Sequence, residues 1–287
     1  MWIYLAFKIA GFTTAYLPTK VGYLIARLVA DTVYVFRPSL RAAIAANLRP
    51  VLGPEVDNAT LKQAVRGVLR NAAKNYFDLI HLPHMKLDDI DSRITTHGWQ
   101  NFEDALNRGK GVILVTAHLG SFDMAGQILA ARSAKVTVLV EALKPAVLLS
   151  HVSALRGSKG VTCIPVQLGV LGVVIQTLHR GEVVGLVCDR DVEKDGFKSK
   201  FFGKETTLPV GAVRIAMRTG AEVVPMFNLR RGDGRYDVYF EPALDIIPSG
   251  DGAVARNMER IIAVMERYIR TSPEQWVVLS PIWASEQ

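Results

Sequence analysis

The stretch Gly111-Val-Ile-Leu-Val-Thr-Ala-His-Leu-Gly-Ser-Phe-Asp123 carries the clearest structural pattern of this chain. Its first half is an uninterrupted apolar run, which predicts a buried strand that ends at His118. Gly120 and Ser121 then supply a flexible link and a helix N-cap, so that a helix follows with Asp123 in its first turn. This H-x4-D spacing requires the chain to turn if the imidazole and the carboxylate are to meet.

The two ends of this motif have the right chemistry for proton transfer. An imidazole at the mouth of a strand can act as a general base towards a hydroxyl group when a carboxylate fixes its tautomer and stabilises the imidazolium. We therefore expect His118 to be the catalytic base and Asp123 to be its orienting partner. The alternative is a structural histidine that is hydrogen-bonded within the core.

Strands and helices alternate from about residue 110 onwards, which predicts an α/β fold with a largely parallel central sheet flanked by helices. The strand-like runs cover 112–117, 136–141, 161–166, 183–188, 223–228 and 236–241. The helix-like segments lie near 121–132, 145–156, 169–180, 209–219 and 254–271. Residues 1–90 differ, because 39–52 and 58–80 are amphipathic helices with no strand signal between them. We expect this helical N-terminal region to pack on a core formed by residues 91–287.

The net charge of +7 is concentrated near the N-terminus. Residues 1–50 contain six basic side chains against Asp31 alone, interleaved with eight aromatic side chains. This mixture predicts a helical segment that associates with anionic lipid and places aromatic rings at headgroup depth. Its uncharged runs reach about 11 residues, whereas a spanning helix needs roughly 20. Helices buried in the domain and a short spanning anchor are the alternatives.

Other functional classes find little support in the composition. The basic residues accompany large aliphatic and aromatic ones instead of forming a polar stripe, so nucleic acid is not expected as a partner. Cys163 and Cys188 fall in strand-like runs and are expected to be buried thiols of a reducing compartment. The sequence contains no P-loop, dinucleotide, zinc-protease or nucleophile-elbow motif.

Several polar residues lie near the ends of the predicted strands, at the edge where open α/β sheets bind ligands. Glu141 ends the second strand, Arg156 precedes the third, and Asp189 and Asp191 follow the fourth. Each has an ordinary structural explanation when taken singly, but their shared edge indicates a site with His118. The Asp-x-Asp pair has a competing meaning, because it could hold a divalent cation in a metal-dependent glycosyltransferase.

These and further motifs occur in the order of one family. They are the H-x4-D segment 111–126, Val140-Glu-Ala-Leu-Lys-Pro145, Arg156-x-x-x-Gly160, Asp189-Arg-Asp191, Phe201-Phe-Gly203, Arg218-Thr-Gly-Ala221 and Pro225. On these motifs the chain resembles the bacterial lysophospholipid acyltransferase superfamily. Within it, the chain is similar to the branch of lipid A late acyltransferases (lauroyl and myristoyl transferases) and phosphatidylinositol mannoside acyltransferases. The resemblance covers most of the chain, from the 41–48 helix to Pro273-Glu-Gln-Trp276.

The resemblance implies a peripheral O-acyltransferase on the cytoplasmic face of the cell membrane. It implies transfer of a fatty acyl chain from acyl-CoA or acyl carrier protein to a hydroxyl of a glycolipid, with membrane lipids as further partners. Glu141 and Arg156 would line the acceptor groove, and Asp189 and Asp191 would contribute a polar site near the acceptor head.

The thioester is a co-substrate, and neither a cofactor nor a metal is expected. The second catalytic position is usually Glu in the lipid A enzymes. The Asp123 of this chain therefore favours a resemblance to the phosphatidylinositol mannoside acyltransferases. Lysophospholipid acylation, the glycosyltransferase and a non-catalytic lipid-binding protein remain as alternatives.

Overall fold

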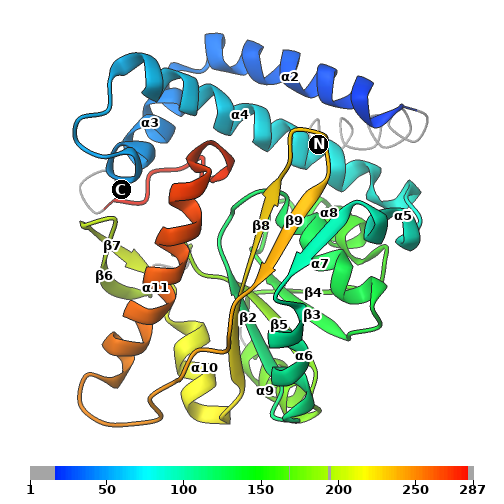
Figure 1. Ribbon diagram of the computed structural model, residues 1–287, viewed down its shortest axis with the longest axis vertical. Coiled ribbons are helices and arrows are strands. Elements are labelled where there is room, and N and C mark those ends of the chain that lie inside the picture. Colours follow the sequence, from blue (N-terminus) through cyan, green and yellow to red (C-terminus); the bar gives the residue numbers. More distant parts are fainter. Residues whose placement is uncertain (1–16, 168, 193–194, 284–287) are drawn as a thin grey trace.

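The computed structural model describes residues 17–167, 169–192 and 195–283, which form a mixed α/β fold around a seven-stranded sheet (Figure 1). The strands of this sheet are β1 (Ile94–His97), β2 (Val112–Thr116), β3 (Val136–Val140), β4 (Thr162–Pro165), β5 (Val183–Val187), β8 (Glu222–Arg230) and β9 (Tyr236–Phe240). Their order is β1-β9-β8-β2-β5-β3-β4. Strands β8 and β9 pair antiparallel, and the five other neighbouring pairs are parallel. The predicted fold class is confirmed.

Helices cover both faces of the sheet, and a separate hairpin lies beside it. The helices are α2 (Thr19–Phe36), α3 (Pro38–Leu52), α4 (Asn58–His81), α5 (Leu87–Ser92), α6 (Trp99–Asn107), α7 (Phe122–Ala131), α8 (Ala146–Gly157), α9 (Val170–His179), α10 (Gly211–Thr219) and α11 (Ala253–Thr271). The short 3-10 helices are η1 (Leu82–His84) and η2 (Pro273–Gln275), and the hairpin joins β6 (Phe197–Phe201) to β7 (Lys204–Leu208).

Strand β2 lies at the centre of the hydrophobic core. Every residue of β2 is buried, as expected of a parallel strand that is covered on both faces. Ile113 and Val115 belong to a cluster with residues of α3, α4, α9, α10 and α11. Val112 and Leu114 belong to a second cluster with residues of α5, α6 and α7. The strand that precedes the H-x4-D histidine is therefore fixed from both sides.

The predicted N-terminal helices are present, and they share the core of the sheet. Helices α3 and α4 match the predicted 39–52 and 58–80 segments, and both contribute to the cluster around Ile113. Helix α2 packs along α4 through the small residues Gly22, Ala26 and Ala30. A Cβ on Gly22 would lie 2.1 Å from the ring of Phe77, so the close approach depends on glycine.

The predicted membrane-associating segment is described only from residue 17 onwards, and its residues 1–16 lie outside the described part. No helix in the described ranges is both long and apolar enough to cross a membrane.

Candidate active site

His118 and Asp189 meet because they follow neighbouring parallel strands. Strands β2 and β5 pair in register up to Thr116 and Val187, and both chains then emerge at the same edge of the sheet. Nδ1 of His118 lies 2.8 Å from Oδ1 of Asp189. The backbone N–H of His118 also donates to Oδ2 of Asp189, at 3.0 Å. One carboxylate thus holds both the ring and the main chain of the histidine.

Asp189 is fully buried, and protein groups donate to both of its oxygens. The indole N–H of Trp276 provides a third donor, at 2.7 Å from Oδ2. Burial by itself raises the pKa of Asp189, but the neighbouring imidazole and the three donated hydrogen bonds outweigh it and leave this pKa below its usual value. The carboxylate is therefore ionised at neutral pH.

An ionised carboxylate can only accept hydrogen bonds, so the imidazole must carry a hydrogen on Nδ1. When His118 is neutral, the lone pair then lies on Nε2, and the side chain remains 24% exposed. The ring of Phe122 packs edgewise against the imidazole with a centroid distance of 5.3 Å. A partly exposed imidazole whose tautomer and orientation are both fixed is the arrangement that a general base requires.

Asp123 has a different partner from the predicted one. Its carboxylate accepts from Nε and Nη2 of Arg156, at 2.7 and 3.5 Å. The Asp123 charge is the largest influence that raises the pKa of Arg156. Gln127 ties the two residues together by donating to both of their backbone carbonyls, at 3.2 Å each. Among the described contacts, His118 therefore bonds to Asp189, and Asp123 forms an ion pair with Arg156.

Glu141 and Asp191 lie in two further interactions beyond the strands. Glu141 accepts from Nη2 of Arg190 at 2.5 Å, which links the segments after β3 and β5. Oδ2 of Asp191 accepts from the backbone N–H of Gly196 at 3.0 Å. Asp189 and Asp191 thus bond to different groups. Asp189 bonds to His118, whereas the resemblance implied that it contributes to a polar site near the acceptor head.

Trp276 contacts the candidate site through Asp189, and the sequence indicated it only as part of the Pro273-Glu-Gln-Trp276 motif. It follows all strands of the sheet in the sequence. The segment that carries it passes next to Asp189, which no local sequence pattern reveals. Phe201 packs against Trp276 with a ring centroid distance of 5.9 Å, and both side chains are buried. The Phe201-Phe-Gly203 segment therefore packs against the indole that donates to the Asp189 carboxylate.

The two cysteines are free thiols. Burial raises the pKa of Cys188 to about 12 and that of Cys163 to about 11. Both thiols are protonated at neutral pH, so neither has the thiolate character of a nucleophile. At this edge of the sheet, His118 is therefore a better candidate than either thiol for proton-transfer chemistry.

Comparison with known proteins gives consistent similarities. A model of the family described as bacterial lipid A biosynthesis acyltransferase matches residues 1–285. A phosphatidylinositol mannoside acyltransferase of Mycobacterium tuberculosis (strain CDC 1551 / Oshkosh) is 32% identical over 217 residues, which are 74% of this chain and 67% of the relative. The corresponding protein of strain H37Rv gives the same values. A protein of the same name from Mycolicibacterium smegmatis is 27% identical over 225 residues, covering 77% of this chain and 73% of the relative.

Proposed function

Because the chain belongs to the bacterial lipid A biosynthesis acyltransferase family, we propose that it uses His118 to transfer a fatty acyl chain from a thioester donor to a hydroxyl of a glycolipid. The donor is acyl-CoA or acyl carrier protein. The acceptor is a phosphatidylinositol mannoside-like glycolipid, as the names of the relatives suggest, and a lipid A-like acceptor is the second candidate. The observation that carries the proposal is the hydrogen bond between His118 and the buried Asp189.

The chemistry needs one base and no covalent enzyme intermediate. Nε2 of His118 accepts the proton of the acceptor hydroxyl while its oxygen attacks the thioester carbonyl carbon. Asp189 stabilises the imidazolium that forms, as the carboxylate does in a catalytic triad. The tetrahedral intermediate collapses with cleavage of the C–S bond, and the imidazolium returns its proton to the departing thiolate. The products are the ester and the free thiol.

The oxyanion of the tetrahedral intermediate needs donors beside His118. The first turn of α7 offers them, because Ser121 at its N-cap makes no side-chain capping hydrogen bond. The backbone N–H groups at the start of the helix are therefore not capped by that side chain. Arg156 is the second candidate, with its guanidinium held by Asp123 in the first turn of the same helix.

Helix α2 supports peripheral attachment to a membrane. It buries Gly22, Ala26 and Ala30 against the protein and exposes large aliphatic side chains, among them Leu24 at 56% and Leu28 at 60%. A helix at a water-facing surface has the opposite distribution. The apolar face of α2 is therefore suited to the acyl layer of a bilayer, which supports the proposal of peripheral attachment; the cytoplasmic face of the cell membrane is the proposed location.

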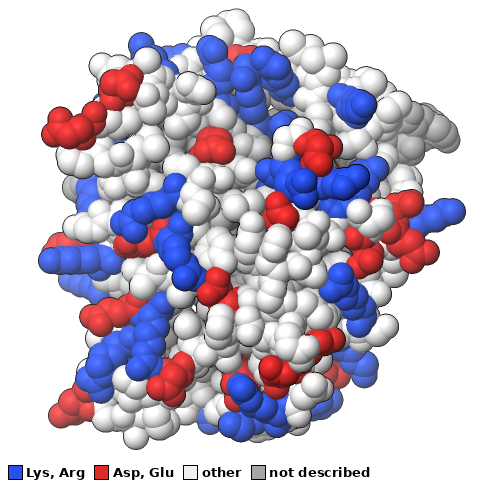
Figure 2. All heavy atoms as spheres, viewed as in Figure 1, with Lys and Arg blue, Asp and Glu red and all other residues white. Residues whose placement is uncertain are grey.

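Basic side chains next to α2 are suited to lipid headgroups. Figure 2 shows Lys and Arg side chains gathered over α2 and α4, at the top of the view. A groove of about 780 Å³ on this side is lined by Lys62, Arg66 and Arg70. Asp31 of α2 pairs with both arginines. Glu274 also lines the groove, so the three basic side chains face two carboxylates, and the remaining positive charge would attract anionic lipid.

Acyl transfer to defined acceptors tests the proposal. Radiolabelled acyl-CoA and acyl carrier protein are each offered with a phosphatidylinositol mannoside, a lipid A precursor and a lysophospholipid. The wild-type protein should acylate the mannoside, and His118→Ala should lower the turnover by about 10²–10⁴-fold with the fold intact.

His179→Ala is the matched control, because His179 is exposed at the end of α9, away from the catalytic edge of the sheet. Near-normal turnover in folded His118→Ala would refute the single-base mechanism. Faster acylation of the lysophospholipid would refute the proposed acceptor.

A further inference from the structure

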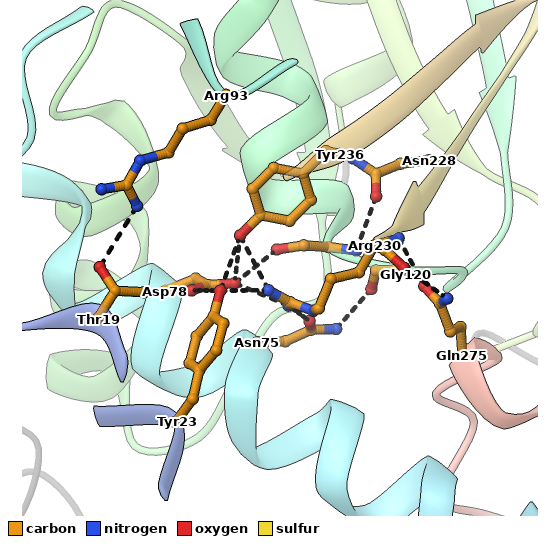
Figure 3. A network of polar contacts seen from close by, with 11 residues as sticks. Thr19, Tyr23, Asn75, Asp78, Arg93, Gly120, Asn228, Arg230, Tyr236 and Gln275 are labelled. Atoms are coloured by element: carbon orange, nitrogen blue, oxygen red, sulfur yellow. Dashed lines mark hydrogen bonds and ion pairs between the residues drawn. The ribbon is translucent and has the colours of Figure 1, made fainter. Parts of the chain in front are cut away.

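A network of buried polar side chains surrounds the turn that links the two ends of the H-x4-D motif (Figure 3). At its centre is Arg230, the last residue of β8, whose side chain is 3% exposed. The proposed acyl-transfer chemistry does not use this arginine. A buried ion pair adds little net stability, because removing two charges from water is costly. Its effect on the conformation of the groups around it can therefore matter more.

Both peptide groups of Gly120 are connected to Arg230. The carbonyl of Gly120 accepts from Nδ2 of Asn75 at 2.6 Å, and Oδ1 of Asn75 accepts from Nη2 of Arg230 at 2.7 Å. On the other side, the N–H of Gly120 donates to the carbonyl of Gln275 at 3.0 Å. The Gln275 side chain exchanges two hydrogen bonds with the backbone of Arg230, at 2.7 and 3.0 Å. The hydrogen bonds form a closed ring around the turn.

Asp78 connects the same arginine to the residue after Gly120. Its Oδ2 accepts from Nη2 of Arg230 at 2.7 Å, from the hydroxyl of Tyr236 at 3.0 Å and from Oγ of Ser121 at 3.2 Å. The hydroxyl of Tyr23 donates to Oδ1 of Asp78 at 2.9 Å. Ser121 thus bonds to Asp78 instead of capping α7, and Tyr23 extends the network to α2.

The turn held by this network has little freedom. Gly120 has φ +61°, and a Cβ at this position would lie 2.3 Å from the carbonyl oxygen of Asn228. His118 precedes the turn, while Phe122 and Asp123 follow it. A displacement of the turn would therefore move the ring that packs on the imidazole and the carboxylate that holds Arg156.

We infer that Asn75, Asp78 and Arg230 are positioning residues for the reaction. They contact neither His118 nor Asp123 in the described interactions, and they act by fixing the turn between them. This inference rests on the proposed function of His118 as base. Through Tyr23, the network also connects the catalytic turn to the helix with the exposed apolar face.

The test compares two buried asparagines. Asn75→Ala removes the two hydrogen bonds to Gly120 and Arg230, and Asn257→Ala removes the two bonds that Asn257 makes with the backbone of Ile247. Asn257 is fully buried, and the segment it holds follows Leu244, which pairs with the start of β8 at the opposite edge of the sheet from His118. The two variants should lose similar thermal stability.

Asn75→Ala should lower kcat by about 10–100-fold, which is the range for a slightly misplaced catalytic group. Its KM for the acyl donor should stay within about twofold of wild type, because Asn75 bonds to Gly120 and Arg230 and not to the donor. Asn257→Ala should retain wild-type kcat. A fall in kcat for Asn75→Ala no larger than that for Asn257→Ala would overturn the inference.

A second readout is independent of turnover. In protein labelled at histidine, the ring Cε1–H resonance of His118 reports the position of the Phe122 ring, and it is assigned by its loss in His118→Ala. We expect this resonance to shift in Asn75→Ala and to be unchanged in Asn257→Ala. An unchanged resonance in Asn75→Ala would also overturn the inference. Retained activity in His118→Ala would refute the proposed function without changing the interpretation of this measurement.

Tyr23→Phe provides the test if Asn75→Ala does not fold. It removes one hydroxyl from the network and keeps the aromatic ring that packs on Phe77. The hydroxyl bonds to Asp78, Arg230 and Tyr236. The expected loss of kcat is therefore at least about threefold to tenfold, the range of a single hydrogen bond, again with a shift of the His118 resonance. Wild-type kcat and an unshifted resonance would contradict the positioning network.

Discussion

The carboxylate of Asp189 lies 2.8 Å from Nδ1 of His118, although 71 residues separate the two in the chain. Their proximity results from the in-register pairing of β2 and β5, which delivers one residue from each strand to the same edge. The carboxylate that orients the His118 imidazole thus follows a neighbouring strand, and the acid within the H-x4-D motif remains available to hold Arg156.

Asp189→Asn should lower turnover by about 10²–10⁴-fold, because the amide can donate to Nδ1 and stabilise the wrong imidazole tautomer. The KM for the glycolipid acceptor should change little, since Asp189 is fully buried behind the histidine. Steady-state kinetics on the purified variant measures both constants. A rise in acceptor KM with unchanged kcat would instead indicate that Asp189 contacts the acceptor.

The Asp189 carboxylate should also stabilise the fold in a pH-dependent way. Its pKa is lower in the folded protein than in the unfolded chain, so its contribution is fully present above about pH 4 and is lost as the pH falls through the folded pKa. The advantage of wild type over Asp189→Asn in free energy of unfolding should therefore be constant above about pH 4 and should shrink as the pH falls further. Urea unfolding measures it, with Asp245→Asn as the control, because the Asp245 side chain is 97% exposed. An advantage that grows on acidification would contradict the ionised state.

The ion pair between Asp123 and Arg156 should couple the two residues energetically. Side-chain exposures of 11% and 21% predict a coupling free energy of about 0.5–3 kcal/mol in a double-mutant cycle of Asp123→Asn and Arg156→Met. Urea unfolding of the four proteins measures this coupling, and additive single effects would contradict it.

Asp123→Asn should lower turnover less than His118→Ala. The reverse order would count against His118 as the base.

Activity should persist after treatment with EDTA. A divalent cation at the Asp-x-Asp pair would need the oxygens of Asp189, and both of these accept hydrogen bonds from His118 and Trp276. The acyl-transfer assay with and without chelator is the measurement. Abolition of activity by EDTA, followed by rescue with Mn²⁺ or Mg²⁺, would favour a metal-dependent mechanism.

The apolar face of α2 should be needed for vesicle binding. Replacing Leu24 and Leu28 by Glu should weaken flotation with anionic vesicles and lower activity on a bilayer-embedded acceptor more than on a short, water-soluble analogue. Thr32→Glu adds charge on the same helix without removing an apolar side chain, so it should bind better than the double variant. Equal loss in the two proteins would mean that charge alone holds the protein on lipid, and unchanged flotation of the double variant would refute the role of α2.

The sequence predicted most of the sheet because its buried strands are continuous apolar runs. The strand expected at 112–117 corresponds to β2, and the one expected at 183–188 corresponds to β5. Strand β1, Ile-Thr-Thr-His, was missed because it contains a single large apolar residue. The β6–β7 hairpin was missed because β6, Phe-Lys-Ser-Lys-Phe, has apolar residues only at its two ends.

The sequence indicated which polar residues lie near this edge of the sheet, but it did not indicate which of them form hydrogen bonds with one another. Polar groups after several strands indicated one edge of the sheet, and the structure places His118 and Asp189 together there. The partner of His118 was expected five residues away, because spacing along the chain is all that a single sequence offers. The order of strands decides which ends are neighbours, and it depends on tertiary packing. The contribution of Trp276 likewise depends on a late segment crossing the site.

The position of this late segment beside the site has a consequence for the order in which the site is completed during synthesis. The segment around η2 supplies the indole of Trp276 to Asp189, the carbonyl of Gln275 to Gly120 and the N–H of Val277 to the carbonyl of His118. A ribosome makes this segment after every strand of the sheet, so the donors that it supplies are the last part of the site to be synthesised. Domains generally fold as units during synthesis. We therefore expect the surroundings of His118 to be complete, and the proposed acyl transfer to begin, only once this late segment has left the ribosome and docked.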